Sequence, residues 1–146
     1  MSAVADFLEG VGVDAAGRDL ETVLASDDGA LERSHDFIQW LFPLDAPSRA
    51  VATAPVLAGE DVARIRRSTA ARAALARSSR RMLGFYERTG GWRAPHDHNH
   101  LRISRIIKSL RLLLGDAEAD AFRTRIETLC EGDPISAETR RHWSRA

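Results

Sequence analysis

Cysteine is almost absent from this chain of 146 residues, which contains only Cys130. A single cysteine excludes an internal disulfide and is typical of a reducing compartment. The sequence also lacks an apolar run approaching the roughly 18 residues of a membrane span, and residues 1–10 lack the basic and apolar segments of a signal peptide. We therefore expect a soluble, cytoplasmic protein with a hydrophobic core and no transmembrane segment.

Lysine is nearly missing as well, since Lys108 accompanies 20 arginines. Together with abundant alanine, this bias is typical of GC-rich coding and indicates a bacterial source. The net charge is zero, but residues 1–60 hold 11 acidic and 3 basic groups, whereas residues 61–115 hold 3 acidic and 13 basic groups. Either the two regions face each other in one fold, or the basic region forms an anion-binding surface.

Motifs of catalysis and nucleotide binding are missing too. The chain has no Gly-x-Ser-x-Gly element, no phosphate-binding glycine loop and no dinucleotide fingerprint. Cys130 lies on an apolar helical face, where a free cysteine typically acts as a small hydrophobic residue. We therefore expect no enzyme activity, no catalytic residues and no cofactor, with an enzyme of undefined reaction as one alternative.

Helical periodicity dominates the chain, and neither a strand pattern nor a repeat occurs. The expected fold class is all-α, a single domain over residues 1–146 built as an irregular array of about six to seven helices. A helix is expected from about Asn99 to Leu114, because Gly115 follows it as the usual glycine beyond a helix end. Asp116 is expected to cap the next helix, and the C-terminal helices of residues 116–146 are expected to pack onto the rest.

The most apolar segment is His35-Asp36-Phe37-Ile38-Gln39-Trp40-Leu41-Phe42-Pro43-Leu44. On a helix, its large side chains cover most of the circumference, which indicates a central helix contacted from several sides. The pattern predicts that this helix runs from about Asp28 to Phe42. Carboxylates of Asp27 and Asp28 are available to cap it, and Pro43 ends it.

This segment, followed by His98-Asn99-His100-Leu101-Arg102-Ile103-Ser104-Arg105-Ile106-Ile107-Lys108-Ser109-Leu110, resembles the conserved domain of the opioid growth factor receptor family. The resemblance spans about Leu20 to Leu114. It implies an all-helical, non-enzymatic binding module with receptor activity toward a short peptide similar to opioid growth factor. A short peptide or a protein is therefore the expected partner. Animal members of the family are described as nuclear or membrane-associated.

The second motif predicts a polar stripe along its helix. On a helical wheel, Arg102, Arg105 and Ser109 fall close to His98, with apolar residues on both flanks. Such a stripe is expected to be partly buried, and buried arginines require partners. The stripe is either a structural polar seam or part of a pocket for a short peptide or an anion.

The expected central helix would carry a matching stripe of Asp28, Glu32, His35 and Gln39. If the two stripes form a binding site, its residues should come from both motifs. The candidate ligand-binding residues are His35, Gln39, His98, Asn99, Arg102 and Arg105.

Three alternating histidines, His96, His98 and His100, raise the question of a metal site. Zinc requires three or four convergent ligands, which one short loop rarely supplies. We predict that these histidines do not converge and that the chain holds no metal. The family pattern has an aromatic residue where His100 stands, so this position departs from it.

Nucleic acid is the alternative partner, through the arginine-rich middle of the chain. Clustered arginines are suited to contact phosphates. Against this reading, the net charge is zero and no helix-turn-helix spacing occurs. The arginines concerned are Arg64, Arg66, Arg67, Arg72, Arg77, Arg80, Arg81 and Arg88.

Overall fold

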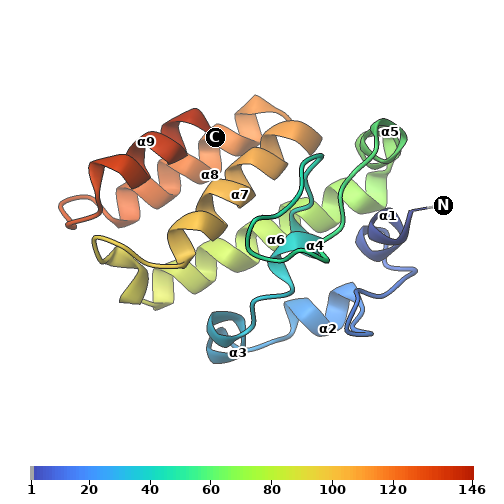
Figure 1. Ribbon diagram of the computed structural model, residues 1–146, viewed down its shortest axis with the longest axis horizontal. Coiled ribbons are helices and arrows are strands. Elements are labelled where there is room, and N and C mark those ends of the chain that lie inside the picture. Colours follow the sequence, from blue (N-terminus) through green and yellow to red (C-terminus); the bar gives the residue numbers. More distant parts are fainter. Residues whose placement is uncertain (1) are drawn as a thin grey trace. The chain divides into compact units, whose positions relative to one another are not determined.

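The structure, a computed structural model, describes residues 2–146 and divides into two compact units, one ending at Ser78 and the other comprising Ser79–Ala146. Within residues 2–146 the regular secondary structure is helical, apart from an isolated bridge between Leu44 and Val56 (Figure 1). The all-α class is confirmed. Nine α-helices occur in the described residues, however, where about six to seven were expected. None of these helices is both long and apolar enough to cross a membrane.

The first unit begins with three short helices whose starts are set by capping side chains. Oxygen atoms of Ser2, Asp19 and Asp27 accept backbone N–H groups of the first turns, the last at 2.7 Å. The predicted capping role of Asp27 is thereby confirmed. The helices of this unit are α1 (Ala3–Leu8), α2 (Leu20–Leu24), α3 (Asp28–Arg33), α4 (Ile38–Leu41), α5 (Gly59–Arg67) and the first half of α6 (Thr69–Arg88).

The predicted continuous helix from Asp28 to Phe42 is wrong, because α3 ends at Arg33 and α4 starts at Ile38. Ser34 has an extended backbone (φ −81°, ψ 137°), and the Asp36 carboxylate accepts a hydrogen bond from Arg18 at 3.0 Å. Serine and aspartate favour such breaks because their side chains compete with the helical hydrogen bonds. The expected stripe through residues 28, 32, 35 and 39 therefore does not lie on one helix.

The core of the first unit brings α1, α4 and α5 together. The rings of Phe7 and Trp40 meet edge to face with their centroids 5.6 Å apart, and Leu41 and Phe42 are buried. Helix α5 begins after Ala58, which has no side-chain oxygen to act as a cap. The carboxylate of Asp61 compensates by accepting the Ala58 N–H at 2.8 Å. The apolar motif is thus a core element, as expected.

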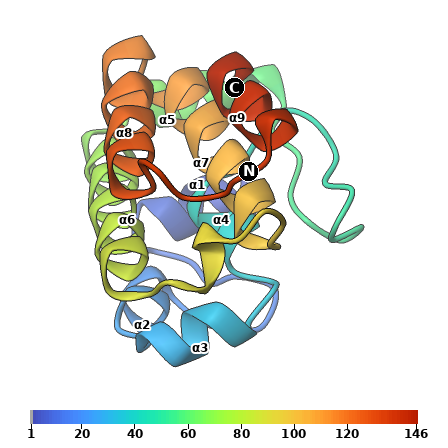
Figure 2. The same cartoon turned by 90° about the vertical axis from the view of Figure 1, so that its left-hand side faces the viewer.

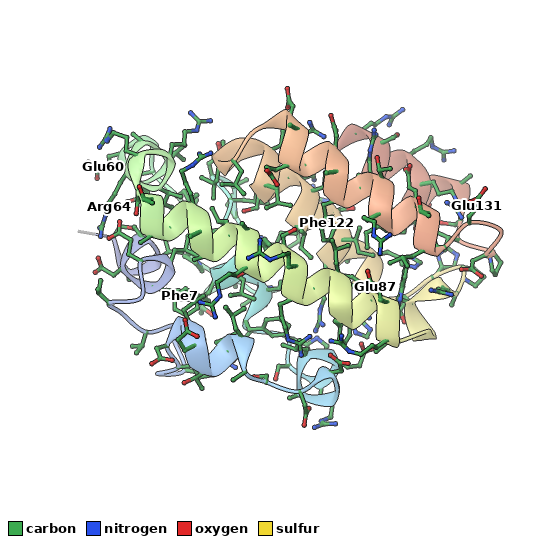
Figure 3. All side chains as sticks on the ribbon, turned by 180° about the vertical axis from the view of Figure 1, so that it is seen from behind. Phe7, Glu60, Arg64, Glu87, Phe122 and Glu131 are labelled. Carbon is green, nitrogen blue, oxygen red and sulfur yellow. The ribbon has the colours of Figure 1, made fainter. Side chains whose placement is uncertain are left out.

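An ion-pair cluster joins α5 to α1. Its central residue is Arg64 of α5, which Figure 3 labels. The Arg64 guanidinium donates to Asp6 at 2.7 Å and to the two carboxylate oxygens of Glu9 at 3.1 and 2.9 Å. These hydrogen bonds lower the pKa of Glu9, more than burial raises it. The three side chains are about one-third exposed or less.

Acidification should destabilise the first unit through this cluster. Because the pKa of Glu9 is lowered from its ordinary value of 4.5, the pair contributes stability that is fully present above pH 4.5 and lost as the pH falls through the folded value. We expect wild-type stability, measured by urea unfolding, to decline over this window more steeply than that of Glu9→Gln. Parallel pH profiles for the two proteins would contradict this role of Glu9.

The second unit contains the rest of α6, a short 3-10 helix η1 (Gly91–Arg93), α7 (Asn99–Leu113), α8 (Asp116–Leu129) and α9 (Ala137–Arg145). Helix α7 packs against both α8 and α9, as Figures 1 and 2 show. Its inner face consists of apolar residues that are at most 1% exposed, and Phe122 of α8 is also buried (Figure 3). These α7 residues are Ile103, Ile106, Ile107, Leu110 and Leu113.

Gly115 ends α7 as predicted. It has a positive φ of 116°, which glycine adopts readily, and its N–H donates to the Leu110 carbonyl at 2.9 Å. The predicted capping role of Asp116 is wrong, since Asp116 is the first residue of α8 and makes no cap hydrogen bond there. Its carboxylate instead accepts from Arg111 at 2.8 Å, because α7 places that guanidinium one turn away.

Candidate functional site

The predicted ligand-binding residues come from both units, and each set is described within its own unit. The two from the first motif lie in the first unit, at the break before α4 and on α4 itself. The others lie at the N-terminal end of α7 and one or two turns along it. The first set is His35 and Gln39, and the second is His98, Asn99, Arg102 and Arg105.

Gln39 is a buried polar residue on α4, whereas His35 is exposed in the break between α3 and α4. The Gln39 side chain is only 4% exposed, and its Oε1 atom has no hydrogen-bond partner among the described residues. An unsatisfied buried carbonyl oxygen costs about 1–3 kcal/mol. Such a group in a native protein requires an explanation, and a bound water or ligand is one.

Asn99 anchors the start of α7 from inside the second unit. It is 1% exposed, and its Oδ1 accepts from the Tyr86 hydroxyl at 3.3 Å. Its backbone N–H and its Nδ2 both donate to Asp97 Oδ1, at 2.9 and 3.0 Å. Asn99 therefore holds the first turn in place and turns its amide inward.

His100 connects the same turn to η1 and α9. Its Nε2 lies 2.6 Å from the Trp92 carbonyl, which only accepts, so Nε2 carries the proton and Nδ1 accepts from the Thr139 hydroxyl at 3.3 Å. The Trp143 indole N–H donates to the His100 carbonyl at 3.1 Å, and the two rings meet edge to face at 5.6 Å. The imidazole thus packs as an aromatic ring inside the second unit.

These contacts also concern the question of a metal site at His96, His98 and His100. His96 and His98 are exposed, while His100 is 5% exposed with both ring nitrogens facing protein groups. A metal bound to His100 would have to displace Trp92 or Thr139 from the ring. The absence of a metal site stays a prediction.

The polar stripe on α7 is partly buried, as predicted. Arg102 is 6% exposed and Ser109 is fully buried, whereas Arg105 is half-buried. Desolvation lowers the pKa of Arg105 to about 10. Arg105 therefore still carries positive charge at neutral pH. The two alternatives for these arginines, a structural polar seam and a ligand-binding site, both stay predictions.

The outward side of α7 carries residues that sequence reasoning missed. Leu101 is 72% exposed, although the helical pattern grouped it with the apolar flank, and Lys108 is exposed as well. A wheel drawn from His98 places both residues about 60–80° to one side of it. The helical wheel shows that the two residues share a side of the helix, but it does not show that this side is exposed.

The arginine-rich region is partly neutralised within the first unit. Arg64 is paired with α1, and the Arg77 guanidinium binds both carboxylate oxygens of Glu21 at 2.6 and 2.9 Å. A phosphate would have to compete with these carboxylates. Nucleic-acid binding stays a prediction, and at least Arg64 and Arg77 are already paired with carboxylates.

Comparison with known proteins gives a family match. Residues 14–90 match the opioid growth factor receptor (OGFr) conserved region, which includes the first motif and ends before His98. Opioid growth factor receptors of Mus musculus and Rattus norvegicus are each 39% identical over 98 residues, which cover 55% of this chain. The alignment covers 15% of the mouse protein and 17% of the rat protein. No solved structure matches the chain.

Proposed function

Because the chain belongs to the opioid growth factor receptor conserved-region family, we propose that it is a non-enzymatic helical binding domain whose ligand is a short peptide. The family match is the observation that carries this proposal. The mouse and rat relatives are named as receptors of opioid growth factor, and this chain spans less than a fifth of their lengths. The proposal therefore concerns one region of such a receptor. Its proposed location is the cytoplasm, which suits a single, buried cysteine.

Gln39 supports the proposal from within the matched segment. A residue of the first motif keeps a polar side chain in the core although its Oε1 lacks a protein partner in the described chain. Replacing such a group by an apolar one of similar size is usually neutral or stabilising. Gln39 thus gives up some stability that an apolar residue would provide. This is accounted for if its oxygen accepts an N–H group from a ligand.

The proposal is tested by titrating the ¹⁵N-labelled protein with opioid growth factor. We expect saturable chemical-shift changes below about 1 mM peptide, with the Gln39 side-chain amide among the affected signals. Gln39→Met keeps the side-chain volume and removes the amide, so it should weaken binding. Its free energy of unfolding should stay unchanged or rise by about 1 kcal/mol.

One result would count against this function, and two would count against the proposed role of Gln39. If no signal moves saturably, peptide binding of this kind is absent from the chain. If Gln39→Met binds as tightly as the wild type, the Gln39 amide has no part in recognition. A large loss of stability in Gln39→Met would assign the amide a structural role.

A further inference from the structure

Helix α1 is attached to its unit by side chains. The backbone hydrogen bonds that the structure describes for residues 2–13 all join residues of this segment to one another, and the Val11 N–H closes the helix on the Asp6 carbonyl at 3.0 Å. Gly10 has a positive φ of 81°, and Val11 and Val13 are 76% and 51% exposed. A helix held only by its side chains, on an exposed linker, is attached in the way that a helical peptide is bound by a protein.

This short helix has an apolar face and an acidic face. The ring of Phe7, labelled in Figure 3, meets Trp40 edge to face with the centroids 5.6 Å apart. Asp6 and Glu9 are neighbours on the helix and both accept hydrogen bonds from Arg64, at 2.7 and 2.9 Å. Trp40 of α4 and Arg64 of α5, here called the α1-binding surface, thus receive one aromatic ring and two carboxylates. The buried residues of α1 are Val4, Ala5, Phe7 and Leu8.

The α1-binding surface lies in the segment that matches the family, whereas α1 lies outside it. The match covers residues 14–90, which include Trp40 and Arg64 and begin after the end of α1. Aromatic residues and arginine are the residue types that contribute most often to the binding energy of protein interfaces. The family region therefore presents two such residues to a helical segment that does not belong to it.

We propose that the peptide of the proposed function binds at the α1-binding surface, and that α1 occupies this surface as an intramolecular ligand. The expected ligand is a short amphipathic helix with an aromatic residue that packs on Trp40. It carries carboxylates one position before and two positions after that residue, which pair with Arg64. Because the linker is short, α1 competes at a local concentration of about millimolar order, and a free peptide binds only when α1 detaches. This inference rests on the proposed function and adds the site, the ligand pattern and its regulation.

The test titrates the ¹⁵N-labelled chain with a synthetic peptide of residues 2–9, blocked at both ends. Phe7→Ala in the chain weakens the attachment of α1, so this variant should bind the peptide at least about tenfold more tightly than the wild type. The Trp40 indole should be among the shifted signals. Glu9→Gln removes one charge and leaves the core intact, so it tests the inference even if Phe7→Ala fails to fold. It should bind up to about fivefold more tightly than the wild type.

Two controls accompany this titration. Val11→Ala alters an exposed residue of the linker, so this chain should bind the peptide as the wild type does. The peptide carrying Phe7→Ala lacks the ring that packs on Trp40 and should bind none of the chains.

Hydrogen exchange of the wild type measures the detachment of α1 directly. If α1 opens by itself, its amides should exchange with a lower free energy of opening than those of α5. The Glu9 N–H, which donates to the Ala5 carbonyl at 2.9 Å, reports on α1. Saturating opioid growth factor should speed this exchange, because it holds the chain in the form from which α1 is detached.

Helix α1 is a permanent part of the core, and the inference is overturned, if α1 and α5 open with equal free energies. Peptide binding that is absent from both variants, or equal in both variants and the wild type, overturns it as well. Opioid growth factor that binds without changing the exchange of α1 overturns the site and leaves the proposed function in place. Binding of the peptide of residues 2–9 without binding of opioid growth factor keeps the site and overturns opioid growth factor as its ligand.

Discussion

Replacing Trp143 with alanine should lower the free energy of unfolding by about 3–5 kcal/mol, the usual loss for a large buried aromatic residue. Trp143 is fully buried in the second unit, its ring packs on His100, and its N–H is hydrogen-bonded to the His100 carbonyl. The substitution removes both contacts and leaves a cavity between α9 and α7. Urea unfolding followed by far-UV circular dichroism gives the change in midpoint.

Trp143→Phe is the matched control. It keeps an aromatic ring near His100 and removes only the indole N–H and part of the ring, so the loss should be closer to 1 kcal/mol. If the alanine variant unfolds at the wild-type urea concentration, Trp143 does not hold α9 against α7. Equal losses in both variants would place the whole effect in the hydrogen bond.

The second large effect is expected for Trp40→Ala in the first unit, again about 3–5 kcal/mol. Trp40 is 9% exposed and its ring meets that of Phe7, which links the apolar motif to α1. Because protein interiors are close-packed, the neighbouring side chains can fill the resulting cavity only in part.

Val11→Ala provides the comparison for this substitution. Val11 is 76% exposed, so its truncation should change stability by no more than about 0.5 kcal/mol. Thermal and urea unfolding of Trp40→Ala, Val11→Ala and the wild type measure both effects. A Trp40→Ala protein that melts with the wild type would show that the motif is not the centre of this unit's core.

The uneven charge along the chain is partly balanced within each unit. The first unit holds 12 acidic and 8 basic groups, and the second holds 9 acidic and 13 basic groups. Arg18 pairs with Asp14 and Asp36, and Arg111 pairs with Asp116 and Asp120. A charge that looks unbalanced over a stretch of sequence is thus often neutralised by residues brought together locally. Lys108 is one of the basic residues that give the second unit its net positive charge.

Local signals in the sequence were enough for the fold class, for the family and for the limits of α7. The helix Asn99–Leu113 begins and ends within about one residue of its predicted limits, because periodicity and Gly115 act over a single turn. The burial of the motif around Trp40 followed from its composition alone, since so many large apolar side chains cannot all face water.

Only the tertiary structure decided the features that depend on distant partners. The break at Ser34–Phe37 accompanies a contact from Arg18, which lies 18 residues before Asp36. The role of His100 depends on Trp92 and Thr139, which no periodicity connects to it. Leu101 has the composition of a core residue, but α8 and α9 cover other sides of α7 and leave it exposed. Helical spacing determines which residues share a face, whereas packing determines which face is buried.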